Sequence, residues 1–385
     1  PTSGCYELIT SGHRMPLEPG QVLKVSYDDK SLPWTIYAKE DVPLAPRAGV
    51  EVKDVVAGRS FHWRKNIDVT LPGNIIVERD KKEERIILSN DVLFENYLAC
   101  LIASEMNATC PPAFVRAQAV AARSWAFVFL RNKHPNEPFD VCNDDDCQRY
   151  QGTTHLNEEA LAAVAQCRGQ FLINQEGFVL PAYYSKCCGG HQELAQNVFG
   201  FPVKGLSAEL DGLSIEQAYC SPKYVDKKAL SEYLGAVDEE GSYFRWQTNV
   251  SAQTIISSLQ EKFGLADVSS LLDVIPGQQG VSGRIKNLTI VYMNEEDAKR
   301  VFLLSDQYDI RKALHDTFLY SSAFDYEVER QEDGAISSLK LSGKGWGHGV
   351  GLCQLGALGM ALEGLDYCKI LRHYYRETSL KRVYP

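Results

Sequence analysis

One stretch of the sequence combines a lone imidazole with an unusual glycine spacing. It reads SGKGWGHGVGLCQLGA at residues 342–357, where glycines alternate with Lys344, Trp346 and His348. In a β-strand this alternation places the glycines on one bare face and the imidazole on the other. A bare face admits a second backbone or a flat polymer, so His348 could face a ligand. For an isolated glycine-rich segment the favoured explanation is a tight crossing in the core, with a hydrogen-bonded structural histidine. The spacing fits no nucleotide-binding loop, so we expect no nucleotide or organic cofactor.

A second stretch ends on a carboxylate suited to proton transfer. Residues 93–106 read LFENYLACLIASEM, an apolar helix that places Glu105 at its C-terminal end. Partial burial at such a position raises a carboxyl pKa towards neutrality, which a general acid and base requires. The alternative is a glutamate that only solvates the end of a helix.

Polar side chains interrupt the next helix, which is predicted to open at Pro111-Pro112 and to run to residue 133. It is apolar nearly all round, apart from Arg116, Gln118, Arg123 and Ser124. A helix of this kind is buried, so each polar side chain needs a partner. Arg116 and Arg123 are seven residues apart and share a face, where they could pair with internal carboxylates or serve the site.

Cysteine and histidine are spaced as in a metal site in the acidic loop at residues 139–152. Cys142 and Cys147 enclose three aspartates, including Asp146, and His134 precedes them. Thiolate, imidazole and carboxylate are zinc ligands, so these four residues could hold zinc. The competing explanation is a disulfide in an oxidising compartment.

Further cysteines leave the same two explanations open. The chain has eleven cysteines, many for a cytosolic enzyme. Cys187, Cys188 and His191 lie in CCGGH and are additional metal-ligand candidates. An odd number leaves at least one cysteine outside intrachain disulfides.

The elements that must position these residues predict an α+β protein. Four stretches within residues 15–90 read as strands: QVLKVSYD, NIDVTL, NIIVERD and ERIILSN. Further helices are expected at residues 157–167 and 251–264, with a hairpin at 169–185 and strands in RIKNLTIVYM and AISSLKLSG. The predicted division is a β-rich N-terminal part of the main domain at 1–90, a helical catalytic core at 91–220, an inserted smaller α+β lobe at 221–340, and a glycine-rich strand with C-terminal helices at 341–385.

Charge and hydropathy exclude two classes of function. The net charge is −10, so no positive footprint for nucleic acid is present. No uncharged apolar run approaches the roughly 20 residues of a transmembrane helix, so we expect no transmembrane segment. Because the sequence begins at Pro1 without methionine, we expect that an upstream segment such as a secretory signal was removed, which is compatible with export.

Several of these stretches occur together in a known order. ENYLACLIASEM, RAQAVAARSWAF, AYYSKCCGG and GKGWGHGVGLCQLGALGMALEG, followed by ILRHYY, lie within the span from about Asn74 to Tyr375. Together they resemble the stage II sporulation protein D family, whose domain also occurs in amidase enhancers. The resemblance implies a lytic transglycosylase that cuts peptidoglycan glycan strands, preferring strands stripped of stem peptides. It places the catalytic glutamate, in an Ala-x-Glu-Met motif, on Glu105.

The resemblance also implies the residues around the reaction. A transglycosylase needs one carboxylate, because the sugar's own 6-hydroxyl attacks and yields a 1,6-anhydro product. Some sporulation members have a Cys-x-x-x-His-Cys loop associated with a metal, and here Asp146 stands in the histidine position. The residues that match the family's substrate-binding region are Gln118, Arg123, Tyr183, Tyr184, Ser185, His348 and Gln354.

Three functions follow from this resemblance. The first is an exported lytic transglycosylase of the cell envelope, periplasm or extracellular space, with peptidoglycan glycan strands as its substrate. The second is a non-catalytic amidase enhancer that holds glycan or a cell-wall amidase in the same cleft. The third is a peptidoglycan-binding wall module that uses residues 221–340.

Overall fold

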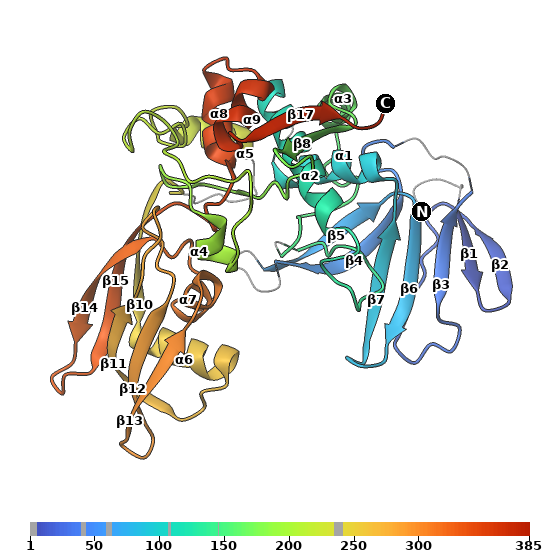
Figure 1. Cartoon of the computed structure of the whole chain (residues 1–385). Helices are drawn as coiled ribbons and strands as arrows, with labels where there is room; N and C mark the ends of the chain where they lie inside the picture. Colours follow the sequence, from blue (N-terminus) through green and yellow to red (C-terminus); the bar gives the residue numbers. More distant parts are fainter. Residues whose placement is uncertain (1–5, 40–43, 59–63, 107–108, 145, 235–241) are drawn as a thin grey trace. The chain divides into compact units, whose positions relative to one another are not determined.

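The computed structural model describes residues 6–39, 44–58, 64–106, 109–144, 146–234 and 242–385. The chain divides into two compact units. Of the described residues, unit 1 contains those up to Gly169 together with Tyr384 and Pro385, and unit 2 contains Gln170–Val383. Helices and strands both contribute throughout, so the predicted α+β class is confirmed (Figure 1).

Unit 1 opens with antiparallel strands. Five of them form one sheet in the order β2-β1-β3-β6-β7, and β4 pairs with β5. The bounds are β1 Tyr6–Thr10, β2 His13–Leu17, β3 Trp34–Ala38, β4 Val50–Ala57, β5 Lys65–Leu71, β6 Asn74–Asp80 and β7 Arg85–Asp91. The three predictions at NIDVTL, NIIVERD and ERIILSN are confirmed by β5, β6 and β7. QVLKVSYD is not a strand: it pairs with no described strand, and Val22 is 78% exposed, so its apolar alternation covers no core.

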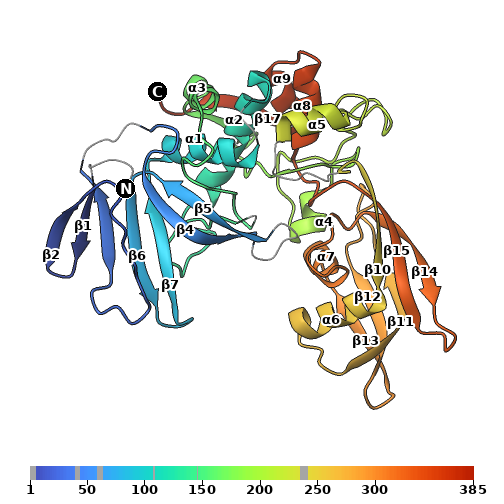
Figure 2. The same ribbon diagram turned by 180° about the vertical axis from the view of Figure 1, so that it is seen from behind.

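Three helices complete unit 1 and pack against one another (Figures 1 and 2). They are α1 Phe94–Glu105, α2 Pro112–Phe129 and α3 Glu158–Gln166, and all three are predicted by the sequence. Asn157 caps α3 by accepting a hydrogen bond from the Ala160 amide, as short polar side chains do at helix starts. α2 ends four residues before the predicted boundary because Leu130 is extended and Arg131 adopts a φ of 65°.

The described residues of unit 2 form two three-stranded sheets, two further strand pairings and six helices. The sheets have the orders β10-β15-β14 and β11-β12-β13, while β9 pairs with β16 and β8 with β17. The strands are β8 Gln170–Asn174, β9 Tyr184–Ser185, β10 Arg245–Ser251, β11 Val268–Pro276, β12 Leu288–Asn294, β13 Lys299–Leu304, β14 Phe324–Arg330, β15 Ile336–Lys344, β16 Leu352–Cys353 and β17 Thr378–Arg382. The helices are α4 Ala195–Phe199, α5 Lys227–Leu234, α6 Ala252–Phe263, α7 Gln307–Ala313, α8 Gln354–Leu362 and α9 Tyr367–Tyr374.

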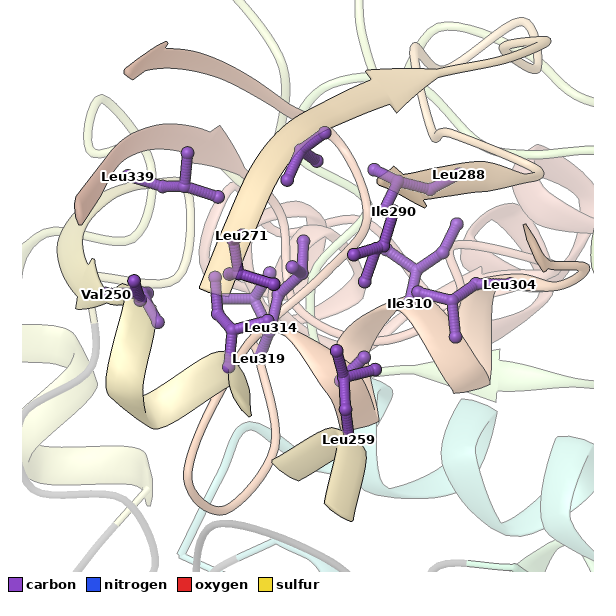
Figure 3. Close-up of a cluster of buried hydrophobic side chains, with 14 of the residues drawn as sticks. Val250, Leu259, Leu271, Leu288, Ile290, Leu304, Ile310, Leu314, Leu319 and Leu339 are labelled. Carbon is purple, nitrogen blue, oxygen red and sulfur yellow. The ribbon is translucent and has the colours of Figure 1, made fainter. Parts of the chain in front are cut away.

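A buried apolar cluster joins both three-stranded sheets of unit 2 to α6 and α7. Leu271 of β11, Leu339 of β15 and Ile310 of α7 are among its labelled members (Figure 3). Ser251 caps α6, and Gly264 closes it in the left-handed conformation that glycine adopts readily. The predicted helix at residues 251–264 is therefore confirmed, with the residue types that the sequence provides for its ends.

The compact units do not divide the chain where the sequence analysis divided it. The boundary lies between Gly169 and Gln170. The segment proposed as an inserted lobe, residues 221–340, lies within unit 2 together with the glycine-rich segment. Among the described residues, no helix is long and apolar enough to cross a membrane.

Candidate functional site

Glu105 is the last residue of α1 and lies at the edge of the core. The preceding residues from Tyr97 to Ser104 are buried, whereas Glu105 is half-buried. Its Oε1 accepts a hydrogen bond of 3.1 Å from the backbone amide of Arg149. The carboxylate is thus held in a fixed orientation at the end of an apolar helix.

The segment that holds Glu105 is itself fastened to both helices. Tyr97 donates its hydroxyl to Gln148 Oε1 at 2.8 Å, and Gln148 Nε2 donates to the Ala122 carbonyl oxygen. Tyr150 stacks on Tyr97 with ring centroids 5.0 Å apart. These contacts fix the backbone on both sides of Arg149, so its amide is positioned before any ligand arrives.

Gln118 on α2 is fully buried. Neither its Oε1 nor its Nε2 has a hydrogen-bond partner among the residues that the structure describes. A buried amide without partners costs about 1–3 kcal/mol of stability. Such a group is consistent with a residue that meets a ligand.

Arg123, predicted to contact substrate, is committed to an internal ion pair. Its side chain is 0% exposed, and its Nε and Nη2 donate to the two carboxylate oxygens of Glu95 at 3.0 and 2.8 Å. The Tyr384 hydroxyl donates to the same carboxylate. Burial raises the pKa of Glu95, but the hydrogen bonds from Arg123 and Tyr384 outweigh it, so that the net pKa is lowered. This geometry favours internal pairing over direct substrate contact, and it ties α1 to α2.

The four predicted metal ligands of unit 1 lie together. One donor atom from each of His134, Cys142, Asp146 and Cys147 falls within 4.8 Å of the others. His134 Nε2 lies 3.1 Å from Cys147 Sγ. The hydrogen bond from Cys147 lowers the pKa of Cys142 to about 6, whereas the same bond and burial raise that of Cys147. Thiols, imidazole and carboxylate at this spacing fit a tetrahedral zinc site.

In unit 2 the glycine-rich segment is not the predicted strand beyond Lys344. β15 ends there, and Gly345, Gly347, Gly349 and Gly351 have φ values of 75°, 89°, 78° and 72°. This left-handed conformation is accessible mainly to glycine. A Cβ on Gly351 would lie 2.0 Å from the Tyr183 carbonyl oxygen. The glycines therefore permit close approach to another backbone, as predicted, but by alternating positive φ rather than by a bare strand face.

The segment that this loop contacts contains the three predicted cleft residues. Tyr184 and Ser185 form β9, and Tyr183 stacks on Phe199 with ring centroids 4.3 Å apart. Ser185 Oγ accepts a hydrogen bond of 3.1 Å from the Gly349 amide. Burial raises the pKa of Tyr183 to about 12, so this phenol stays protonated at neutral pH. Phe199 is not among the site residues predicted from the sequence.

His348 is held as a neutral ring by the backbone. Its Nδ1 accepts a hydrogen bond of 2.9 Å from the Val350 amide, and the ring also bonds the Tyr184 backbone. Burial, followed by the charges of Arg284 and Arg311, lowers the pKa of His348 to about 3. Phe199 contacts the ring edge on. These contacts fit the alternative named above, in which His348 is a hydrogen-bonded structural histidine rather than a group that faces a ligand.

We expect His348 to stay uncharged in the folded protein well below its ordinary pKa of 6.5. Since the folded pKa is the lower one, the unfolded chain gains the proton first, and this group removes stability as the pH falls from 6.5 to about 3. Histidine ring NMR at pH 5 tests this, with the exposed ring of His13 as the reference signal. A charged His348 ring at pH 5 would contradict the burial argument.

Gln354 begins α8 and is 2% exposed. Its Nε2 has no hydrogen-bond partner in the described part of the chain. Unit 1 thus contains Glu105, Gln118, Arg123 and the metal cluster, and unit 2 contains Tyr183, Tyr184, Ser185, His348 and Gln354. That both sets line one cleft stays a prediction.

Comparisons with known proteins match two parts of the chain to family models and most of its length to named relatives. Residues 82–173 match the family model described as Stage II sporulation protein, and residues 205–351 match one described as a domain of unknown function. Over 297 residues the chain is 28% identical to an uncharacterized protein of Brachyspira hyodysenteriae, covering 77% of this chain and 69% of that protein.

Two relatives from Bacillus subtilis carry descriptive names. Stage II sporulation protein D is 24% identical over 307 residues, which are 76% of each chain. Amidase enhancer is 25% identical over 292 residues, and the match spans 73% of this chain but 39% of that protein. The domain match at residues 82–173 and these two relatives show that the chain is similar to the stage II sporulation protein D family.

Proposed function

We propose that this protein acts on the cell wall as an exported lytic transglycosylase that cleaves peptide-stripped peptidoglycan glycan strands. The observation that carries the proposal is Glu105, a half-buried carboxylate oriented by the Arg149 amide at the end of α1. Its position within the matched family domain and the names of the relatives support a cell-wall role.

The proposed reaction uses one carboxyl group twice. Glu105 donates its proton to the glycosidic oxygen while the bond from that oxygen to C1 of the muramyl sugar breaks. The resulting carboxylate then takes the proton of the sugar's own 6-hydroxyl, whose oxygen bonds C1. The product is a 1,6-anhydromuramyl end, no water is consumed, and Glu105 is protonated again.

Aromatic side chains of unit 2 are suited to the sugar. Tyr183, Phe199 and His348 contact one another, and Phe201 lies 6.2 Å from Phe199 while 50% exposed. Aromatic faces pack on the apolar faces of sugar rings. We propose that Tyr183, Phe199 and Phe201, with Ser185 and Gln354, contact the glycan. His348 packs against Tyr183 and Phe199 and supports them.

We further propose that zinc is held by Cys142, Cys147 and His134, with Asp146 as the fourth ligand. Asp146 also pairs with Lys133 at 3.2 Å and is 61% exposed, so it is the weakest member of the set. When bound, the ion supplies rigidity to the loop. Cys147 lies two residues before Arg149, so a fixed loop supports the amide that orients Glu105.

The similarity to the amidase enhancer of Bacillus subtilis favours a second function. In that case the same residues bind glycan or a cell-wall amidase without cutting. Mass spectrometry of digests of intact and peptide-stripped peptidoglycan separates the two. Release of 1,6-anhydromuramyl products supports the transglycosylase; faster cleavage by an added amidase with no such products supports the enhancer.

Gln118 offers a test of substrate contact. We expect Gln118→Leu to raise the free energy of unfolding by about 1–3 kcal/mol, since two unpartnered polar groups are removed. If the amide binds glycan, the same change lowers product release at least tenfold. Chemical denaturation and product analysis measure the two effects.

Gln307 on α7 is a matched control, because it too is buried with both amide atoms unpartnered among the described residues. Gln307→Leu should stabilise the protein similarly and leave product release unchanged. Equal product release by the two variants would show that Gln118 does not contact the glycan.

A further inference from the structure

Four cysteines from three distant parts of the sequence converge inside unit 2. The thiols of Cys188, Cys220 and Cys353 and a carboxylate oxygen of Asp211 all lie within 4.8 Å of one another. The Cys187 thiol is within hydrogen-bonding range of the thiols of Cys220 and Cys353. All five residues are buried, at 2% exposure or less.

The sulfur atoms form one mutually contacting cluster rather than exclusive pairs. Cys188 Sγ and Cys220 Sγ are 3.7 Å apart, and the Cys353 thiol contacts the thiols of all three other cysteines. A tetrahedral zinc centre with Zn–S bonds of about 2.3 Å has sulfur atoms about 3.8 Å apart. A disulfide requires about 2.05 Å and joins sulfurs in exclusive pairs. The observed spacing fits the first geometry.

Backbone amides around the cluster are placed to stabilise thiolates. Cys353 Sγ accepts from the Cys188 amide at 3.2 Å and from the Gly356 amide at 3.3 Å. The second amide belongs to the first turn of α8, for which Cys353 is the N-cap, so the helix dipole also favours negative charge. The Gly189 amide bonds Cys187 in the same way.

A buried cation faces the cluster. Arg284 is 0% exposed, and its guanidinium donates to the Cys188 carbonyl oxygen, the Gly347 carbonyl oxygen and Ser282 Oγ. Among the described residues no carboxylate lies within ion-pair distance of it, and it reaches Glu193 only through the Ser282 hydroxyl. A fully buried charge needs a counter-charge. An anionic thiolate centre beside Cys188 supplies one.

We propose that Cys187, Cys188, Cys220 and Cys353 form a structural tetrathiolate zinc site, separate from the ligand cluster of unit 1. Asp211 is the outer carboxylate: one of its oxygens accepts from the Tyr374 hydroxyl and the other from the Cys220 amide at 2.8 Å. With both oxygens engaged, it orients the Cys220 segment, and the four sulfurs complete the coordination. No coordination position is left for substrate, as in structural zinc sites.

The site explains why this part of unit 2 can be rigid without regular structure. It joins the turn after β9, the Cys220 segment and the start of α8. The Cys187-Cys188 turn requires Gly189 and Gly190, whose φ values are 78° and 107°. The glycine-rich loop packs on that turn through the backbone pairing of Cys187 with Trp346. Zinc binding therefore fixes both segments that carry the predicted glycan contacts of unit 2.

Metal content tests the proposal independently of wall cleavage. The starting protein is the full chain with Cys142→Ser and Cys147→Ser, which removes two ligands of the unit 1 cluster. Purified under reducing conditions and loaded with Zn²⁺, it should retain one metal ion per chain by native mass spectrometry. Replacement by Co²⁺ should give the intense sulfur-to-cobalt charge-transfer absorption of a tetrathiolate site.

Additional variants identify the ligands. Cys220→Ser should lose the bound ion, whereas Cys368→Ser, at a half-buried cysteine outside the cluster, should keep it. Asp211→Asn should keep the ion, because Asp211 is not a ligand. Loss of the ion in Asp211→Asn with retention in Cys187→Ser would overturn the ligand set. A starting protein that binds no Zn²⁺ and shows disulfides among these cysteines by peptide mapping would overturn the site, even if Cys220→Ser fails to fold.

Discussion

Glu105→Gln is expected to lower the release of 1,6-anhydromuramyl products by about 10²–10⁴-fold, the contribution of general acid–base catalysis. Glutamine keeps the shape of the side chain and an oxygen that can accept from the Arg149 amide. It has no proton to give to the glycosidic oxygen and cannot take one from the 6-hydroxyl. The effect should therefore fall on the rate rather than on glycan binding.

Glu159→Gln provides the matched control for this loss. Glu159 lies in the first turn of α3, also in unit 1, and is exposed. Its replacement should change neither product release nor unfolding beyond the effect of a surface substitution, about 0.5 kcal/mol. Mass spectrometry of digests, with circular dichroism of each variant, compares the two glutamates directly.

Two outcomes would contradict the role of Glu105. Equal product release by the wild type and Glu105→Gln would show that another group transfers the proton. Absence of product from both, together with retained glycan pull-down or faster cleavage by an added amidase, would replace the enzyme with the enhancer. In that second case Glu105 is a helix-end residue, the alternative that its position in the sequence leaves open.

The sequence predicts the helices of the site well because their signals are local. The apolar run before Glu105 and the prolines before α2 specify where α1 ends and α2 begins, and the structure confirms both. Asn157 and Ser251 likewise supply caps at the predicted starts of α3 and α6. Local propensity, capping and burial agree in these elements, so no distant contact is needed to predict them.

The features that could not be predicted from the sequence depend on contacts between segments that are distant along the chain. Nothing near Cys188 indicates that Cys220 and Cys353 will lie beside it, because that convergence depends on the tertiary fold of unit 2. The glycine-rich segment has the alternation of a strand, yet the close approach to Tyr183 demands positive φ values. Glu95 appears in the sequence only as part of a motif, and its bond to Arg123 emerges when α1 packs on α2.

Arg123→Met is expected to lower the free energy of unfolding by about 3–5 kcal/mol, because it leaves Glu95 without its cationic partner in a largely buried position. Glu95→Leu should cost a similar amount by leaving Arg123 unpaired. The double variant replaces the pair with apolar side chains and should recover most of the loss. Urea denaturation of the four proteins gives the coupling energy of the pair.

The pH dependence of the same proteins distinguishes internal pairing from substrate contact. Hydrogen bonds from Arg123 and Tyr384, opposing burial, hold the folded pKa of Glu95 below its ordinary value of 4.5. A depressed folded pKa contributes stability that is complete above 4.5 and is lost as the pH falls through the folded pKa. The wild type should therefore lose more stability than Arg123→Met between pH 6 and pH 3. If Arg123 instead binds glycan, Arg123→Met will keep the wild-type stability and its dependence on pH but will lose glycan affinity. That outcome would also show that the ion pair with Glu95 does not join α1 to α2.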